Sequence, residues 1–257
     1  MKIKILGAHS TESKVHRMPS ILIDDVIALD AGGLSSTLTA AEQNKIAAVF
    51  ITHQHFDHTR DLITLGANHE PGSSSIAVFA LSDTLEVIKT FMLNEKIYLD
   101  FTRWPSPENP VYKLIPVKPF ELFKFKNYEI LPAPIKHSVP AVGYRIKTGN
   151  SKYLLYTGDT GPDFFEIWLK TAPELIITEV SFPDRFEELC KRAQHICPAF
   201  LREGLVQFYN NKKYWPRVIA AHISLSFEDE IRSEILKVAV GLGISIDLAV
   251  EGMEIDL

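Results

Sequence analysis

The chain has 257 residues, of which 46% are hydrophobic and 23% are charged, and its formal net charge is −5. These values predict one soluble globular domain over residues 1–257 with a large core. They exclude a membrane-spanning protein, because no apolar run approaches about 18 residues, and they argue against a nucleic-acid-binding protein, because no block of basic residues is present.

The two cysteines, Cys190 and Cys197, lack a CxxC pattern and are too few for a disulfide scaffold or a thiolate metal site. Residues 1–6 alternate between polar and apolar side chains and lack the apolar core of a secretion signal. We therefore expect a protein of the reducing cytoplasm.

In the first half of the chain, short runs of branched apolar residues are separated by turn residues, which is typical of strands. Strands are predicted at residues 2–6, 20–24, 26–30, 47–50 and 76–81. Helices are predicted at residues 36–45, at residues 59–65, and from an N-cap at Asp83 to about residue 94.

Residues 103–120 contain five prolines and predict an irregular excursion with a short strand near residues 111–117. Whether this excursion caps a site or crosses the surface is left open. Further strands are predicted at residues 128–131, 135–137, 143–147, 152–156, 175–181, 217–223 and 245–250. Helices flank His195 and cover residues 227–240. Two batches of strands, each followed by helices, predict two sheets packed face to face with helices outside.

Four ligand-type residues directly follow the predicted strand at residues 47–50, namely His53, His55, Asp57 and His58. In an extended segment, side chains two positions apart point the same way, so we expect His53, His55 and Asp57 to converge and His58 to lean toward a neighbouring point. Imidazoles and carboxylates suit one or two divalent metals, with zinc as the first choice. A polar surface loop is the alternative, but packing gives no reason to gather such residues at a strand end.

Three isolated polar residues follow later strands in the same way: His137, Asp159 and His222. A lone histidine at a strand end is more often structural than a metal ligand. Together with the first cluster, however, these three residues complete two coordination spheres.

The order of these residues resembles the metallo-β-lactamase-fold hydrolase superfamily. The resemblance rests on Asp30 in Leu-Asp-Ala-Gly, the His-x-His-x-Asp-His run, His137, Asp159 in Thr-Gly-Asp-Thr, and His222. It implies an α/β protein built as a four-layer αββα sandwich, with a dinuclear metal site between the edges of the sheets.

The resemblance also implies a role for each residue. One metal would be bound by His53, His55 and His137, and the other by Asp57, His58 and His222. Asp159 would bridge the two metals, and Asp30 would orient a ligand imidazole. The family usually has glycine where this chain has Asp61, so we expect a change in the helix start or the rim without loss of a ligand.

Two divalent cations held by two carboxylates and five neutral imidazoles would leave about two positive charges, and they would lower the pKa of a bound water toward about 7. An anionic electrophile is favoured, and a two-metal clamp suits attack on phosphorus. A thioester or a lactone would also be a compatible substrate.

His195, in Arg-Ala-Gln-His-Ile-Cys-Pro, and Glu179, in the strand before it, resemble the phosphodiesterase branch that contains ribonuclease Z and the class II cyclic-nucleotide phosphodiesterases. This resemblance implies that His195 protonates the leaving oxygen while Glu179 holds its ring. The candidate catalytic residues are thus Asp57, His195 and Glu179. A purely structural His195 is the alternative. We expect His9, His16 and His69 on the surface or at a loop rim, although His9 could line the cleft.

Ribonuclease Z carries a long arm that grips tRNA between the third and fourth metal motifs, whereas residues 141–158 leave room here for only a hairpin. We therefore expect a phosphodiesterase for a small phosphodiester such as a 3′,5′-cyclic nucleotide, acting by attack of a metal hydroxide. The alternatives are a ribonuclease Z-like endonuclease and a glyoxalase-like or lactonase-like hydrolase. A redox protein is disfavoured, because redox members of the fold have glutamate in place of His55.

The expected cofactors are two Zn²⁺ ions, with Mn²⁺ or Fe²⁺ as alternatives. The expected partner is a small anionic substrate, with no membrane and no nucleic acid. A homodimer is left open.

Overall fold

In the computed structural model of the chain, residues 1–70 and 72–257 are described, and they form two seven-stranded sheets. The first sheet has the order β14-β1-β2-β3-β4-β5-β6. Its strands are β1 (Lys2–Gly7), β2 (Ser20–Ile23), β3 (Ile27–Leu29), β4 (Ala48–Phe50), β5 (Ile76–Ala80), β6 (Tyr112–Pro116) and β14 (Glu254–Asp256). Pairing is antiparallel from β14 to β3 and parallel from β3 to β6.

The second sheet has the order β13-β12-β11-β10-β9-β8-β7. Its strands are β7 (Phe123–Phe125), β8 (Tyr128–Ile135), β9 (Ala141–Thr148), β10 (Leu154–Tyr156), β11 (Leu175–Glu179), β12 (Arg217–Ala221) and β13 (Ile246–Leu248). Pairing is antiparallel from β7 to β10 and parallel from β10 to β13, so both sheets combine an antiparallel part with a parallel part.

Alternation of side chains along the strands builds the core between the sheets. Phe50 of β4 and Ile177 of β11 belong to one buried cluster that both sheets share. Their neighbours Val49 and Ile176 point to the opposite faces and pack in the separate clusters beneath the helices. Each such apolar side chain stabilises the fold by about 1.5–3 kcal/mol when fully buried.

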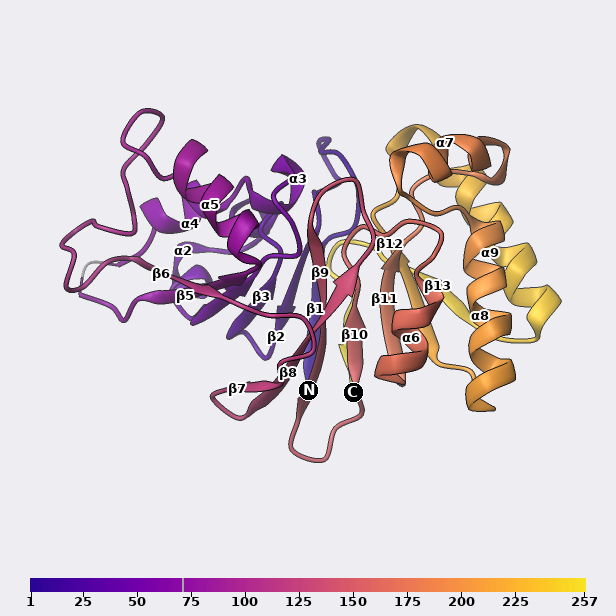
Figure 1. Cartoon of the computed structure of the whole chain (residues 1–257). Helices are drawn as coiled ribbons and strands as arrows, with labels where there is room; N and C mark the ends of the chain where they lie inside the picture. Colours follow the sequence, from indigo (N-terminus) through magenta and orange to yellow (C-terminus); the bar gives the residue numbers. More distant parts are fainter. Residues whose placement is uncertain (71) are drawn as a thin grey trace.

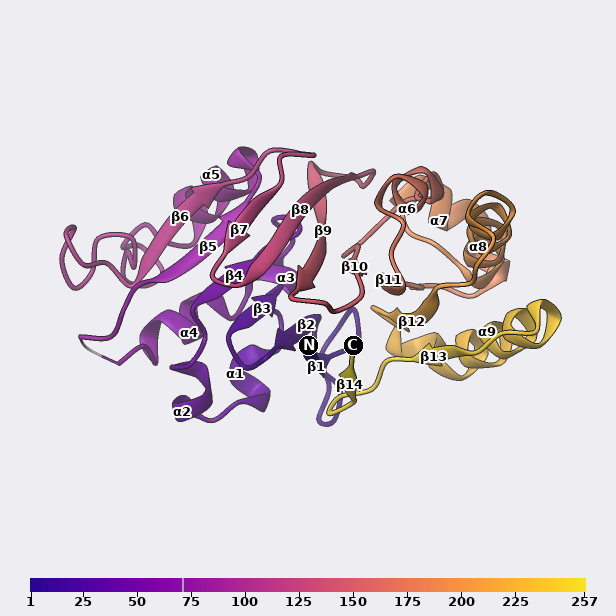
Figure 2. The ribbon, with the colours of Figure 1, turned by 90° about the horizontal axis from the view of Figure 1, so that it is seen from below.

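Helices cover the outer face of each sheet, as Figures 1 and 2 show. The first sheet is covered by α1 (Leu34–Thr37), α2 (Ala40–Gln43), α3 (Phe56–Thr59), α4 (Leu62–Ala67) and α5 (Ser82–Phe91). The second is covered by α6 (Phe165–Thr171), α7 (Glu187–Ala193), α8 (Pro198–Lys212) and α9 (Glu228–Leu242). The predicted four-layer αββα sandwich is confirmed. Within the described residues, no helix has the length and apolar character needed to cross a membrane.

Several predicted element bounds were wrong. The helix expected at residues 36–45 is divided into α1 and α2, because Thr39 and Glu42 form a capping box that starts a new helix. The helix expected at residues 59–65 is likewise divided, with α3 ending at Thr59 and α4 starting after Asp61. Helix α5 begins one residue before Asp83 and ends at Phe91.

The last strand of the chain and the edge strand β7 of the second sheet also differ from the prediction. The strand expected at residues 245–250 is not the last, because β14 follows it and pairs with β1 in the first sheet. The chain termini therefore lie close together (Figure 1). Strand β7 was not predicted. The proline-rich excursion at residues 103–120 leads from α5 into the edge strand β6, so it is a crossover along the first sheet.

Candidate metal centre and active site

The polar residues singled out in the sequence lie where strands of the parallel parts of the two sheets end. Asp30 follows β3 and His53 follows β4 in the first sheet. Asp159 follows β10, Glu179 ends β11 and His222 follows β12 in the second. Because parallel strands end at the same edge of a sheet, both sheets direct these side chains toward one region.

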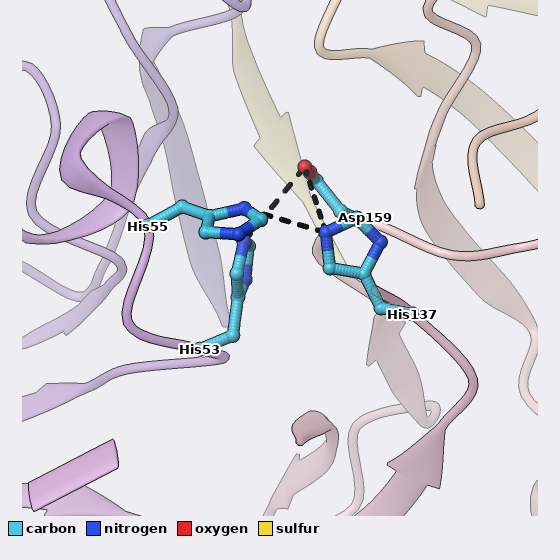
Figure 3. A group of neighbouring side chains, drawn as sticks. All are labelled: His53, His55, His137 and Asp159. Atoms are coloured by element: carbon cyan, nitrogen blue, oxygen red, sulfur yellow. Dashed lines mark hydrogen bonds and ion pairs between the residues drawn. The ribbon is translucent and has the colours of Figure 1, made fainter. Parts of the chain in front are cut away.

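The first group of converging side chains contains His53, His55, His137 and Asp159, shown in Figure 3. The Nε2 atoms of His53 and His137 each lie 3.9 Å from Asp159 Oδ2, and His137 Nε2 lies 3.4 Å from His55 Nδ1. Four nitrogen and oxygen atoms at these separations are suited to binding one metal ion.

The second group contains Asp57, His58, Asp159 and His222. His222 Nε2 lies 3.1 Å from Asp57 Oδ2 and 3.3 Å from Asp159 Oδ1. His58 Nε2 lies 3.2 Å from Asp159 Oδ1. Asp159 belongs to both groups, with Oδ2 toward the first and Oδ1 toward the second.

The expectation that Asp57 converges with His53 and His55 on one point was wrong. The extended chain ends at His55, and Asp57 lies in the single turn of α3, which rotates its carboxylate toward His58 and His222. The division into two groups that the family resemblance implied is the one observed. Ligation itself stays a prediction for each of the seven residues.

Buried atoms without partners indicate that these groups are built for cations. Among the described residues, His53 Nε2, His58 Nε2 and Asp159 Oδ1 are buried and have no hydrogen-bond partner. An orphaned buried polar atom is costly unless something binds it. The residues present therefore fit metal ions, and imidazole and carboxylate donors are those that zinc, manganese and iron accept.

Hydrogen bonds hold four of the five imidazoles in the same tautomer. The Nδ1 atoms of His53 and His58 donate to Thr52 Oγ1 at 3.0 Å and Asp30 Oδ2 at 2.7 Å. His137 Nδ1 donates to the carbonyl of Gln194 at 2.9 Å. His222 Nδ1 donates to a serine hydroxyl at 2.8 Å. With Nδ1 as the donor, the Nε2 atom of each ring is the one that a metal ion would bind, and in His222 it lies 3.1 Å from Asp57 Oδ2.

Asp30 lies at the centre of the supporting network, as the family resemblance implied. Its carboxylate accepts hydrogen bonds from the Thr52 amide at 2.8 Å and from the Tyr156 hydroxyl at 2.7 Å, in addition to His58. Asp30 and His222 both have a left-handed backbone, with φ of 55° and 56°. Non-glycine residues in this region are strained, and such strain gathers at functional sites.

The turn that carries Asp159 packs tightly on the first sheet. Gly158 has φ of 61°, and a Cβ atom there would lie 2.7 Å from the Thr52 side chain. Only glycine fits this close approach. Burial raises the pKa of Asp159, but His222 and His58 lower it well below its usual value, so the carboxylate is charged.

His195 lies beside the second group and is held by Glu179. Its Nδ1 donates to Glu179 Oε2 at 2.9 Å and lies 4.0 Å from Asp159 Oδ2. The turn after α7 brings it there, because Gln194 ends that helix in a left-handed conformation. Burial lowers the pKa of His195, but the charge and hydrogen bond of Glu179 raise it to about 9.

Sequence reasoning assigned no role to Thr52, Ser181 or Tyr156. Ser181 accepts from His222 and donates to Glu179 at 2.5 Å, so it links the metal-type cluster to the His195 pair. Their positions in the sequence could have indicated these roles, because Thr52 adjoins His53 and Ser181 lies two residues after Glu179 at the same strand end.

The expectation for the remaining histidines was wrong in one case. His9 is not on the surface but buried at 1% exposure, and it donates to Glu251 at 2.8 Å. His16 and His69 are partly exposed.

Asp61, the departure from the family pattern, is buried and structural. Its carboxylate accepts from the Ser35 amide at 2.7 Å and from Arg60 Nε at 2.9 Å. It thereby joins the starts of α1 and α4, and it belongs to neither metal-type group.

Comparisons with known proteins agree with this geometry. A family model described as "Beta-lactamase superfamily domain" matches residues 20–223. A probable 3′,5′-cyclic-nucleotide phosphodiesterase of Yersinia pestis is 26% identical over 219 residues, which are 76% of this chain and 62% of that protein. A ribonuclease Z of Acaryochloris marina is 32% identical over 108 residues, which are 41% of this chain and 32% of that protein.

These matches thus span less than two thirds of the relatives' length. Unliganded yeast PDE1 has the same fold, with a TM-score of 0.83 at 17% identity over 100% of this chain and 99% of that one. Because the family model covers residues 20–223, from β2 to the residue after His222, the chain belongs to the beta-lactamase superfamily domain family.

Proposed function

We propose that this chain is a metal-dependent phosphodiesterase that hydrolyses a small phosphodiester such as a 3′,5′-cyclic nucleotide. The proposed metal ligands are His53, His55, Asp57, His58, His137, Asp159 and His222, with Asp159 shared by two Zn²⁺ ions. The proposed catalytic residues are Asp57, His195 and Glu179. Residues 1–257 would act as one domain.

The His195–Glu179 pair is the observation that carries this proposal. Glu179 is 1% exposed and accepts from His195 Nδ1, so Nε2 on the far side of the ring is left for a ligand. A histidine with a raised pKa beside a cluster suited to cations is the arrangement that a general acid needs. In a hydrolase of thioesters or lactones, His195 and Glu179 would have no evident catalytic role.

The residues around the His195–Glu179 pair have separate parts in the proposed reaction, and Asp57 would bind one of the metal ions. Two divalent ions, when bound, would supply a water of lowered pKa and positive charge opposite the phosphate. His195 would donate the Nε2 proton to the leaving ribose oxygen. Glu179 would hold the ring and stabilise its protonated form. Ser181 would fix Glu179 and His222 relative to each other, because its hydroxyl bonds to both. Asp30 would fix the His58 ring.

The small size of the substrate is supported by the segment between His137 and Asp159. It contains β9 and β10, paired antiparallel and joined by residues 149–153, without a further element. The net charge of −5 also opposes binding of a long phosphate backbone. The relative from Yersinia pestis, named as a probable cyclic-nucleotide phosphodiesterase, supports the same substrate class.

The second candidate is a ribonuclease Z-like endonuclease, which the similarity to the Acaryochloris marina protein favours. We expect no cleavage of precursor tRNA at physiological salt, because the described segment between His137 and Asp159 holds only β9 and β10 and the net charge is −5. Efficient 3′ processing would overturn the cyclic-nucleotide proposal in favour of this candidate.

The test is an assay of the purified chain with zinc and with manganese on three substrates: a 3′,5′-cyclic nucleotide, bis(4-nitrophenyl) phosphate and a thioester. We expect hydrolysis of the two phosphodiesters, its loss after treatment with a chelator, and its return when metal is added. Turnover of the thioester alone would contradict the proposal.

A further inference from the structure

A second cluster of ligand-type side chains lies apart from the groups around Asp159. It contains His9, His16 and Glu228, whose ligand atoms lie within 4.8 Å of one another. His9 comes shortly after β1 of the first sheet, and Glu228 is the first residue of α9, which covers the second. The cluster therefore joins the two halves of the protein.

The distances within this cluster do not fit hydrogen bonds. His9 Nε2 lies 3.5 Å from Glu228 Oε2, and His16 Nε2 lies 3.6 Å from the same oxygen. Hydrogen bonds between nitrogen and oxygen span about 2.7–3.2 Å. Zinc bonds of about 2.0–2.1 Å place neighbouring ligand atoms of a tetrahedron about 3.3–3.4 Å apart. The observed distances of 3.5 and 3.6 Å are close to this separation between ligand atoms.

The tautomer of His9 leaves Nε2 free for a ligand. Its Nδ1 donates to Glu251 Oε1 at 2.8 Å, and the Arg17 amide donates to the same oxygen at 2.8 Å. Burial raises the pKa of Glu251, but these hydrogen bonds lower it to about 2, so its carboxylate is charged and acts as the acceptor. Among the described residues, His9 Nε2 is buried without a partner, as are His53 Nε2 and His58 Nε2 in the first site.

The other two members are held in the same manner. His16 Nδ1 bonds to Ser13 Oγ at 2.8 Å, which leaves Nε2 toward the cluster. Glu228 Oε1 accepts from Arg232 Nη2 at 2.9 Å, which leaves Oε2 toward both histidines. Outer partners that fix the far atom of each ligand are typical of metal sites.

We propose that His9, His16 and Glu228 form a separate Zn²⁺ site with three protein ligands and a fourth position open to water. The carboxylates of Glu228 and Glu251 bring two negative charges to the ion, and Arg232, which is bonded to Glu228, brings one positive charge. The bound ion would fasten the exposed loop between β1 and β2 to the start of α9.

The test compares zinc content in full-length protein that has been stripped with chelator, reconstituted with zinc and passed through gel filtration. We expect His16→Ala and Glu228→Ala each to hold one zinc ion fewer per chain than the wild type. Asp229→Asn, an exposed neighbour in the same helical turn, is the matched control and should hold as many ions as the wild type.

The Asp159→Ala background separates this site from the one around Asp159. Adding His16→Ala to that variant should still remove one ion, whatever the first site retains, and should reduce the rise in Tm that zinc produces. Equal zinc content in the wild type, His16→Ala and Glu228→Ala, all shown to fold by thermal denaturation, would overturn the proposal. The cluster would then be a hydrogen-bonded anchor of the loop.

Discussion

His195 and Glu179 are joined through Nδ1 and Oε2 at 2.9 Å, and the glutamate is fully enclosed by the protein around it. The Thr160 amide donates to the other oxygen of Glu179 at 2.5 Å, and the Ile196 amide lies 3.3 Å from Oε2. Four donors, including Ser181, therefore surround one carboxylate. These hydrogen bonds fix the position of the pair, with His195 Nδ1 at 4.0 Å from Asp159 Oδ2.

Replacing His195 with alanine should affect two substrates differently. Turnover of a cyclic nucleotide should fall by about 10²–10⁴-fold, because its ribose oxygen leaves poorly without a general acid. Bis(4-nitrophenyl) phosphate should lose much less, since 4-nitrophenolate leaves without protonation. Kinetics on both substrates, with metal content measured alongside, check this prediction. His69→Ala is the control. Equal losses on both substrates would indicate that His195 only positions the substrate.

Replacing Glu179 with glutamine should move the alkaline limb of the pH–rate profile. A general acid acts in its protonated form, so the rate falls as the pH rises through its pKa. Burial lowers that pKa and Glu179 raises it to about 9, so removing the negative charge should shift the limb to lower pH. The measurement is kcat/KM for a cyclic nucleotide across the pH range, with the exposed Glu203→Gln as control. If the alkaline limb lies at the same pH in Glu179→Gln as in the wild type, Glu179 does not set the pKa of the group that titrates.

Replacing Asp30 with asparagine should weaken metal binding by about 10–100-fold, as loss of an outer partner of a ligand does. The reason is that Asp30 accepts the Nδ1 proton of His58 at 2.7 Å and so directs Nε2 inward. Competition with a chromophoric chelator measures the affinity. The exposed Asp83→Asn provides the matched change of charge, and an affinity that equals that of the wild type would show that His58 does not depend on Asp30.

Replacing Asp159 with alanine should lower the metal content more than any other single change at the site. Asp159 is the residue shared by both groups, and without it several imidazoles and Asp57 face each other with no common carboxylate. Elemental analysis of protein purified without chelator tests this. Asp163→Ala, an exposed aspartate four residues later, is the control. Unchanged metal content in Asp159→Ala would count against a shared ligand.

Much of the fold was readable from local patterns, because strands with alternating apolar residues must bury one or both faces. The αββα layers follow from two batches of such strands with helices after each. The element bounds were less predictable. The capping box at Thr39 and the break at Asp61 depend on hydrogen bonds that compete with a continuous helix. β14 has three residues and exists only because β1 pairs with it.

The sequence by itself indicated which residue types gather at the site, since a run of histidines with Asp57 and polar residues at later strand ends is not what packing of a core requires. The spacing of these residues along the chain did not show how they divide, which only the family resemblance implied, and the tertiary structure supplies the physical reason. One helical turn at α3 sends Asp57 to the second group, and the meeting of two sheet edges brings Asp159 between both. It also decided that His9 is buried, because its environment comes from Glu251 and Glu228, more than 200 residues away along the chain. No local pattern contains such contacts, since they arise only when the two sheets pack together.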